Sequence, residues 1–281
     1  WLDPLPRTDE LGKLYANYYT HGGSAPVDRS VDSPPVDEGA GPWLKLMIKS
    51  LLAAIFPSRR MQFKSELMHC GDKSPGRLLE VGCGSGAFLA KAAAAGWRAY
   101  GIDFDEKAIM AARKIPDVQA EVMDVHDTRL DSQRFDGIAM NNVIEHLPDP
   151  KEVFSRCYEL LEDNGRLVMV TPNLDAQCHE IYSKNWRGLE VPRHLYIYNE
   201  QSLRHLALGA GFSDIQIFCP PNGSQIDFMV ELSTEIARKS GTELPAVDRR
   251  RLKRRNMFSA LRGDTIGEWI VLVAERTPSF G

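Results

Sequence analysis

A short apolar segment that runs directly into alternating glycines constrains this chain more than any other feature. Residues 77–81 read Arg-Leu-Leu-Glu-Val, residues 82–86 read Gly-Cys-Gly-Ser-Gly, and residues 87–96 are rich in alanine and end at a glycine. The first segment is typical of a buried strand and the last of a helix. Glycine has no Cβ, so the backbone between them can turn tightly and approach a ligand closely. This order predicts a strand–turn–helix unit whose turn binds a ligand.

Alternating strand and helix patterns continue along the chain. Further strands are predicted at 98–103, 118–123, 135–141, 166–171, 214–218 and 268–276, and further helices at 105–114, 150–165 and 200–211. Asp105 and Asn199 stand where N-cap residues are expected. Such alternation predicts a parallel sheet covered by helices on both faces, with ligands bound beyond the carboxyl ends of the strands.

Length and composition limit the domain organisation. The chain has 281 residues, of which 43% are hydrophobic and 26% charged, which is typical of a globular protein with one large or two small domains. Residues 20–42 are mostly Gly, Pro, Ser and Asp, so residues 1–42 are interpreted as an N-terminal arm and flexible linker. A helical pattern runs from Trp43 to about His69. One domain is expected over 43–281, with a polar helical insert at about 224–262.

Charge and cysteine content exclude several classes of protein. The net charge of −4 argues against a chain-wide nucleic-acid surface. Five cysteines without a C-x-x-C pair argue against a disulfide scaffold or a zinc ribbon and favour a reducing, cytoplasmic setting. No apolar stretch reaches the ~20 residues of a membrane span, and no signal peptide is visible. A membrane partner is therefore not expected.

Two acidic residues follow the glycine-rich turn at equal intervals. Asp103 ends the second strand, 21 residues after Gly82, and Asp124 follows the third strand, 21 residues after Asp103. An acid at the first position accepts hydrogen bonds from a ribose diol. An acid at the second can accept from an adenine amino group. The pattern indicates a ligand that contains a nucleoside. The ribose of a dinucleotide could bind the first acid equally well, so this acid does not identify the nucleoside.

Four motifs give the chain a specific resemblance. They are E-x-G-x-G-x-G at 80–86, V-I-E-H-L-P-D-P at 143–150, W-R-G at 186–188 and P-R-H-L at 192–195. With them the chain resembles class I S-adenosylmethionine (SAM)-dependent methyltransferases, closest to bacterial quinone-type and small-molecule families. The resemblance implies a Rossmann-like fold. Its seven-stranded, mostly parallel sheet would have helices on both faces, an antiparallel last strand and a helical insert before that strand.

The resemblance also assigns roles around the cofactor. Gly82, Cys83 and Gly84 would pass under the methionine and ribose parts of SAM. Asp103 would hold the ribose hydroxyls, with Phe104 beside the adenine. Cys83 stands at a helix N-terminus, where the pKa of a thiol could fall, although its backbone is the expected contact.

Further cofactor contacts are implied on both sides of this region. Asp124 and the backbone of Val125 would address the adenine edge, and Asn141 would lie near the methionine end. Tyr19 belongs to an N-terminal stretch that either closes over the pocket as a lid or packs on the sheet edge. The reaction implied is transfer of a methyl group from SAM to a small molecule such as a sugar, a quinone or a natural-product intermediate, leaving S-adenosylhomocysteine.

Methyl transfer needs a base only when the nucleophile carries a proton, and histidine is suited to act as that base. Two histidines are therefore the candidate catalytic residues. His194 is interpreted either as a general base or as a loop histidine bonded to backbone, and His146 either as a helix-end packing residue or as catalytic. No metal is expected, since His126, His179 and His205 show no ligand spacing with one another.

Other interpretations remain open. The basic run at 249–255 reads as a solvated helix face or as a patch for nucleic acid or acidic lipid. Nucleic-acid methylation is disfavoured because no Asn-Pro-Pro-Tyr-type motif follows the fourth strand. An NAD-type oxidoreductase and a non-catalytic SAM-binding protein are the alternatives to an enzyme of methyl transfer. The sequence does not indicate the oligomeric state.

Overall fold

The computed structural model describes residues 67–244 and 246–278. Within them lies a seven-stranded sheet in the order β3-β2-β1-β4-β5-β7-β6. The strands are β1 (Arg77–Val81), β2 (Arg98–Asp103), β3 (Val118–Val122), β4 (Phe135–Asn141), β5 (Leu161–Pro172), β6 (Asp214–Phe218) and β7 (Trp269–Glu275). The helices around it are α4 (Ala87–Ala94), α5 (Glu106–Ala112), α6 (Pro150–Leu160), α7 (Gln177–Tyr182), α8 (Glu200–Gly209), α9 (Gly223–Lys239) and α10 (Arg249–Arg262).

The described chain divides into two compact units. The glycine-turn unit comprises residues 67–140, 159–168 and 276–278, and the insert unit comprises 141–158 and the described part of 169–275. The first contains β1 to β3 and nearly all of β4. The second contains β6, β7 and the helical insert before β7.

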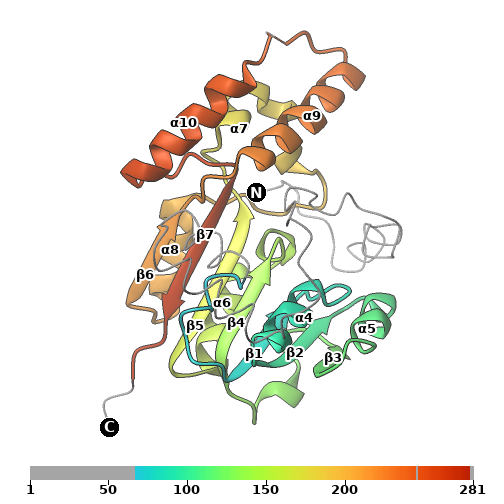
Figure 1. Ribbon diagram of the computed structural model, residues 1–281, viewed down its shortest axis with the longest axis vertical. Helices are drawn as coiled ribbons and strands as arrows, with labels where there is room; N and C mark the ends of the chain where they lie inside the picture. Colours follow the sequence, from blue (N-terminus) through green and yellow to red (C-terminus); the bar gives the residue numbers. More distant parts are fainter. Residues whose placement is uncertain (1–66, 245, 279–281) are drawn as a thin grey trace, which may run out of the picture. The chain divides into compact units, whose positions relative to one another are not determined.

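Parallel strands form the centre of the glycine-turn unit. β1 pairs with β2 in the register Leu79↔Tyr100 and with β4 in the register Leu79↔Ile138. β2 pairs with β3, also in parallel, and α4 and α5 pack against β2 and β3 (Figure 1). Leu78, Leu79 and Ile138 are completely buried, because strands covered on both faces must be apolar throughout. The predicted strand–turn–helix unit is confirmed.

An antiparallel strand pair and a helical layer make up the insert unit. β6 and β7 run antiparallel, with Ile215 opposite Ala274, so the expected antiparallel last strand is confirmed. α7 packs on α9, and α9 on α10. Tyr182, Trp186 and Met229 belong to the buried core between these elements. Trp186 is 1% exposed, so it is a core residue of this unit.

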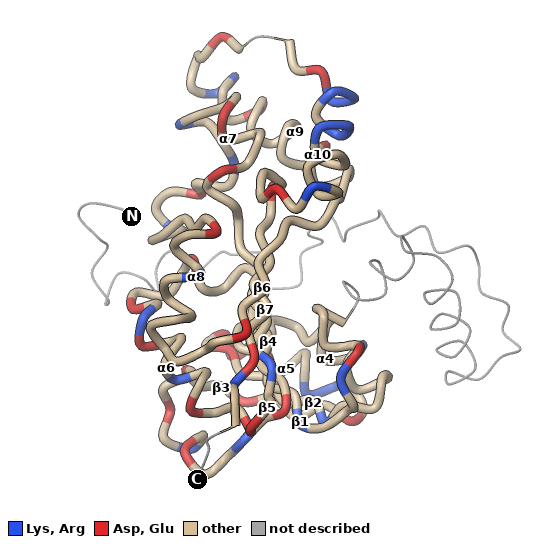
Figure 2. The backbone as a smooth tube through the Cα atoms, turned by 90° about the vertical axis from the view of Figure 1, so that its left-hand side faces the viewer, with Lys and Arg blue, Asp and Glu red and all other residues tan. Residues whose placement is uncertain are grey.

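The basic run forms the first half of α10, where Figure 2 shows lysine and arginine gathered. Lys253 pairs with Asp227 at 2.5 Å and Arg255 with Glu180 at 3.2 Å, so acids of α9 and α7 balance part of the charge. This is the solvated helix face that was one of the two interpretations of the run.

Two predicted helix ends are wrong. The helix at 150–165 ends at Leu160, and β5 begins at Leu161. The reason is tertiary: the N–H of Asn164 donates to the carbonyl of Arg276, and the N–H of Arg276 donates to that of Gly165, both at 2.9 Å. These bonds tie the segment to a distant part of the chain. Residues 67–69 form a turn instead of the end of a helix.

Local signals elsewhere are confirmed. The side chain of Asp105 accepts from the N–H of Lys107, and Asn199 and Ser202 form a reciprocal capping box at the start of α8. All five cysteines are free and buried. Among the described residues no helix is long and apolar enough to cross a membrane. The predicted arm at 1–42, with Tyr19, lies outside the described residues.

Candidate functional site

The glycine-rich turn is held by β2. Backbone N–H groups of Gly82 and Cys83 both donate to the carbonyl of Ile102, at 2.8 and 3.1 Å. Gly82 and Gly84 have φ of 71° and 51°, which other residues rarely adopt. A Cβ added at Gly84 would meet no atom within 4 Å. The backbone at Gly84 is therefore open on the side where a ligand could approach.

Asp103 links this turn to the next loop. Its Oδ2 accepts from the N–H of Gly84 and its Oδ1 from the N–H of Asp105, both at 2.9 Å. The residue is 6% exposed, and burial raises the pKa of its carboxyl group while the backbone donors oppose that rise. Each carboxylate oxygen has a second lone pair, so the group can still accept from a ligand's hydroxyls.

Glu80 is a second acid of this region, and its sequence pattern predicted no role for it. It precedes the turn, is 5% exposed, and its Oε2 has no hydrogen-bond partner in the described part of the chain. Burial, and then the nearby Asp103 carboxylate, raise the pKa of Glu80 well above its usual range. Its place in the E-x-G-x-G-x-G motif was the available signal, but its burial became visible only in the structure.

The other predicted residues of the glycine-turn unit fall around this turn. Phe104 is 66% exposed, as a ring that meets a ligand's flat face can be. Asp124 is exposed and its Oδ1 accepts from the N–H of His126 at 2.8 Å, while the Val125 side chain is buried. The suggestion that the Cys83 thiol has a lowered pKa is wrong: burial raises it, since a thiolate would lose its hydration there.

Asn141 ends β4 and belongs to the insert unit. It is exposed, and its Oδ1 accepts from Nδ2 of Asn142 at 3.2 Å. Asn142 has a φ of 53°, and its own Oδ1 accepts from Nε1 of Trp269 at 2.9 Å. The turn after β4 is thereby fixed by side-chain hydrogen bonds.

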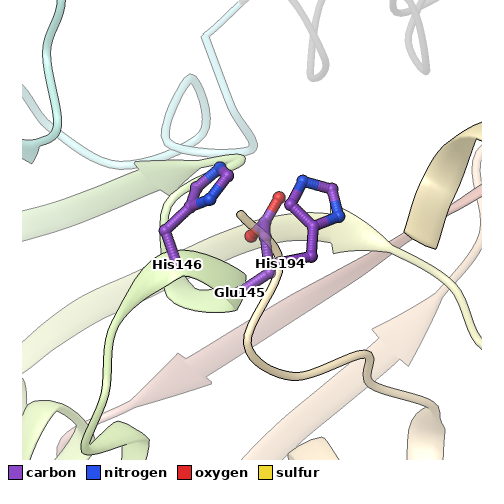
Figure 3. A group of neighbouring side chains, drawn as sticks. All are labelled: Glu145, His146 and His194. Atoms are coloured by element: carbon purple, nitrogen blue, oxygen red, sulfur yellow. The ribbon is translucent and has the colours of Figure 1, made fainter. Parts of the chain in front are cut away.

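Three side chains of the insert unit meet after this turn, and we call them the Glu–His–His centre (Figure 3). Glu145 and His146 lie in a short 3-10 helix, Ile144–His146, and His194 lies 48 residues further along the chain. The ring centroids of His146 and His194 are 4.7 Å apart. One ligand atom from each of the three residues lies within 4.8 Å of the others, so the group could hold a metal ion.

Backbone carbonyls orient both imidazoles. Nδ1 of His146 lies 3.1 Å from the carbonyl oxygen of Arg193, and Nδ1 of His194 lies 2.7 Å from that of Gly188. Burial lowers the pKa of both rings, that of His194 to about 4, where His146 contributes as well. Both imidazoles are therefore neutral at physiological pH. The two interpretations of His194 turn out to be compatible, because it is bonded to backbone at Nδ1 and faces the centre.

Glu145 was not singled out in the sequence, although it lies in the V-I-E-H-L-P-D-P motif. It is completely buried, and its Oε2 accepts from the Thr171 hydroxyl at 3.0 Å. Its Oε1 has no hydrogen-bond partner among the described residues. Burial raises the pKa of Glu145 to about 8.

An ion-pair cluster borders the centre. Glu190 binds Arg187 at 2.5 Å and Arg193 at 3.0 Å, and its Oε2 lies 3.5 Å from Nε2 of His194. Burial would raise the pKa of Glu190, but the two guanidinium groups hold it below its usual range. Arg193 is thus part of an ion pair.

The strand order, the antiparallel β7, the glycine-rich turn and the acid that ends β2 together define a class I SAM-dependent methyltransferase. A SAM-dependent methyltransferase from Thermotoga maritima has the same fold: the TM-score is 0.53 at 17% identity, covering 84% of this chain and 96% of that chain. The expected Rossmann-like fold is confirmed.

Sequence comparison gives the family. The model of the methyltransferase domain matches residues 57–217, more than half of the chain, so the chain belongs to this family. Its cofactor is accordingly S-adenosylmethionine, and the open backbone at Gly84 beside the Asp103 carboxylate fits such a ligand.

Curated relatives match a shorter part. A 37.1 kDa protein of transposon TN4556 from Streptomyces fradiae is 32% identical over 169 residues, covering 54% of this chain and 48% of that protein. A ubiquinone biosynthesis O-methyltransferase from Aromatoleum aromaticum is 31% identical over 109 residues, covering 37% of this chain and 47% of that protein. The chain thus spans about half the length of the curated relatives it matches.

Proposed function

We propose that this chain transfers the methyl group of SAM to a small-molecule acceptor. The observation that carries the proposal is the Asp103 carboxylate, which fixes the N–H of Gly84 while keeping acceptor capacity for a ribose diol. Membership of the methyltransferase-domain family supports it.

We assign the cofactor to residues on both sides of β2. The glycine-rich turn would underlie methionine and ribose, the acid that ends β2 would bind the ribose hydroxyls, and the residues after β3 would bind the adenine edge. The proposed contacts in the glycine-turn unit are Gly82, Cys83, Gly84, Asp103, Phe104, Asp124 and Val125. The assignments of Asn141 as a cofactor contact and of Tyr19 as a lid residue stay predictions from the resemblance.

The reaction is an in-line displacement at a carbon that the sulfonium already activates. The enzyme mainly supplies proximity and alignment, which can contribute ~7–11 kcal/mol. An acceptor with a weakly acidic hydroxyl must also lose its proton. We assign that proton to the Glu–His–His centre, where the imidazole of His194, with His146 beside it, is neutral and can accept it.

The acceptor is proposed to be a hydroxyl-bearing small molecule of the sugar, quinone or natural-product kind. The name of the relative from Aromatoleum aromaticum, a ubiquinone biosynthesis O-methyltransferase, supports oxygen as the methylated atom.

The ribose assignment is tested by measuring SAM affinity of Asp103→Ala by calorimetry. Loss of charge-assisted hydrogen bonds should cost ~1.5–3 kcal/mol, or about 10–150-fold in Kd. Asp103→Asn keeps the shape of the side chain and should lie between the wild type and alanine. Unchanged affinity in a folded Asp103→Ala variant would sink the assignment.

Transfer itself is tested with methyl-labelled SAM and a cell extract split into small-molecule and macromolecular fractions. Label is expected in the small-molecule fraction, and His194→Ala should lower its rate ~10²–10⁴-fold with an unchanged Kd for SAM. His205→Ala, on the exposed side of α8, is the matched control. Label in protein or nucleic acid would overturn the acceptor class, and SAM binding without any transfer would indicate a non-catalytic SAM-binding protein.

A further inference from the structure

The hydrogen bonds of the two imidazoles determine which nitrogen carries a proton. A carbonyl oxygen can only accept, so Nδ1 of His146 and Nδ1 of His194 donate to the carbonyls of Arg193 and Gly188. Each neutral ring therefore has its lone pair on Nε2. Histidines that bind metals commonly donate their other ring N–H to a backbone carbonyl in this way.

The carboxylate of the centre is prepared in a similar manner. Oε2 of Glu145 is occupied by the Thr171 hydroxyl, which leaves Oε1 as the atom without a hydrogen-bond partner in the described part of the chain. A completely buried carboxyl oxygen without a donor is unfavourable unless a ligand binds it. One oxygen and two nitrogens from three residues thus lie close together.

We propose that the Glu–His–His centre binds one divalent transition-metal ion of the zinc type, through a carboxylate oxygen of Glu145 and Nε2 of His146 and His194. Two imidazoles and one carboxylate are a ligand set for such ions, and three protein ligands leave a position open. Metal–ligand bonds of about 2.1 Å place tetrahedral ligands about 3.4 Å apart. One ligand atom of each residue lies within 4.8 Å of the others, so the side chains would draw together around the ion.

The surroundings suit an ion that must also receive another ligand. His146 is only partly buried, whereas Glu145 and His194 are buried. Oε2 of Glu190 lies 3.5 Å from Nε2 of His194, so a cation at that lone pair would be attracted by a second carboxylate. That carboxylate is shared with Arg187 and Arg193, which keeps it outside the ligand set.

The ion would add a mechanism to the proposed methyl transfer. Its chemical role therefore rests on the proposed function. A hydroxyl oxygen of the acceptor would fill the open position, and the ion would lower the pKa of that hydroxyl so that its proton passes to water. An oxygen lone pair then forms the bond to the methyl carbon, and the carbon–sulfur bond breaks with its electron pair going to sulfur. The products are a methyl ether, S-adenosylhomocysteine and one proton. When the ion is bound, the imidazoles are its ligands. Water, instead of an imidazole, then accepts the proton of the acceptor's hydroxyl group.

Metal binding is measured directly on the full chain after removal of metals with a chelator. Zn²⁺ titrated by calorimetry should bind with one equivalent, and Co²⁺ should give visible absorption typical of a low-coordinate site with nitrogen ligands. Glu145→Gln and His194→Ala should each weaken Zn²⁺ binding at least about 100-fold, since each removes a direct ligand, whereas outer partners of a site already contribute 10–100-fold. His205→Ala should bind Zn²⁺ as the wild type does.

The outcomes separate the ion from the proposed function. Absence of a one-equivalent site, or an affinity that neither ligand variant changes in folded protein, would overturn the metal proposal. Methyl transfer that persists at full rate in chelator would do the same and leave the proposed function standing, with imidazole as the base. A chain that binds Zn²⁺ at this centre but shows no SAM binding would retain the metal site and refute the proposed function.

Discussion

The Asp103 carboxylate accepts hydrogen bonds from two loops of its own unit. Both its oxygens accept from backbone N–H groups, of Gly84 and Asp105, and these bonds set the spacing between the glycine-rich turn and the loop after β2. The acid is therefore a structural residue as well as a proposed ribose contact. Its spacing from Gly82 was enough to identify it, because the residue types and their order are local properties.

Glu80 should make the stability of the ligand-free protein depend on pH. Its pKa is raised in the folded state, so the folded protein keeps a proton that the unfolded chain releases near pH ~4.3. The free energy of unfolding should therefore fall as the pH rises above that value, by up to about 1.4 kcal/mol per pH unit, until the folded-state pKa is passed.

Glu80→Gln removes this titration. Compared with the wild type by urea unfolding, the variant should show a flatter profile, with its relative advantage growing toward alkaline pH. Parallel profiles for the two proteins would show that another group is responsible.

Helix ends show which elements local chemistry determines. The start of α8 is set by Asn199 and Ser202, whose side chains satisfy each other's backbone N–H groups. The end of α6 is different, since the bonds between Arg276 and residues 164 and 165 come from a remote segment. An N-cap can thus be predicted from neighbouring residues, whereas a helix end that depends on a distant segment cannot.

The cap of α8 gives a prediction for a single element. Asn199→Ala should lower the free energy of unfolding by about 1 kcal/mol, because the N–H of Ser202 loses its acceptor. Asn199→Asp keeps an acceptor at the same place and should stay close to the wild type. Equal stability of the alanine and aspartate variants in chemical denaturation would contradict the role of the cap. The Kd for SAM should not change in either variant.

Ligand binding tests the molecule as a whole. SAM at 100 times its Kd should raise the free energy of unfolding by about 2.7 kcal/mol, and thermal unfolding should shift upward. For Asp103→Ala at the same SAM concentration, a 10–150-fold weaker Kd leaves about 0.3–1.4 kcal/mol. NAD at the same concentration should leave the transition unchanged. Stabilisation by NAD and none by SAM would favour the oxidoreductase alternative instead.

The division of the chain into two units explains why the candidate site was predicted unevenly. Within the glycine-turn unit, the expected cofactor residues follow successive strands of a parallel sheet, so their order along the chain predicts their neighbourhood. In the insert unit, Glu145 and His194 come from segments 49 residues apart. No periodicity or short spacing relates them.

The amino-acid sequence by itself determined the alternation of strands and helices, the glycine-rich turn and the acid after β2. Each depends on residues close in the chain, through backbone freedom, apolar pattern or capping. Only the tertiary structure decided that Glu80 and Glu145 are buried, that α6 stops at Leu160, and that His146 and His194 share a centre. The histidine spacing considered in the sequence concerned His126, His179 and His205, and no spacing rule could group His146 with His194, because residues from distant segments are brought together by packing. Burial and long-range contacts are properties of the folded chain, and the chemistry of the Glu–His–His centre depends on both.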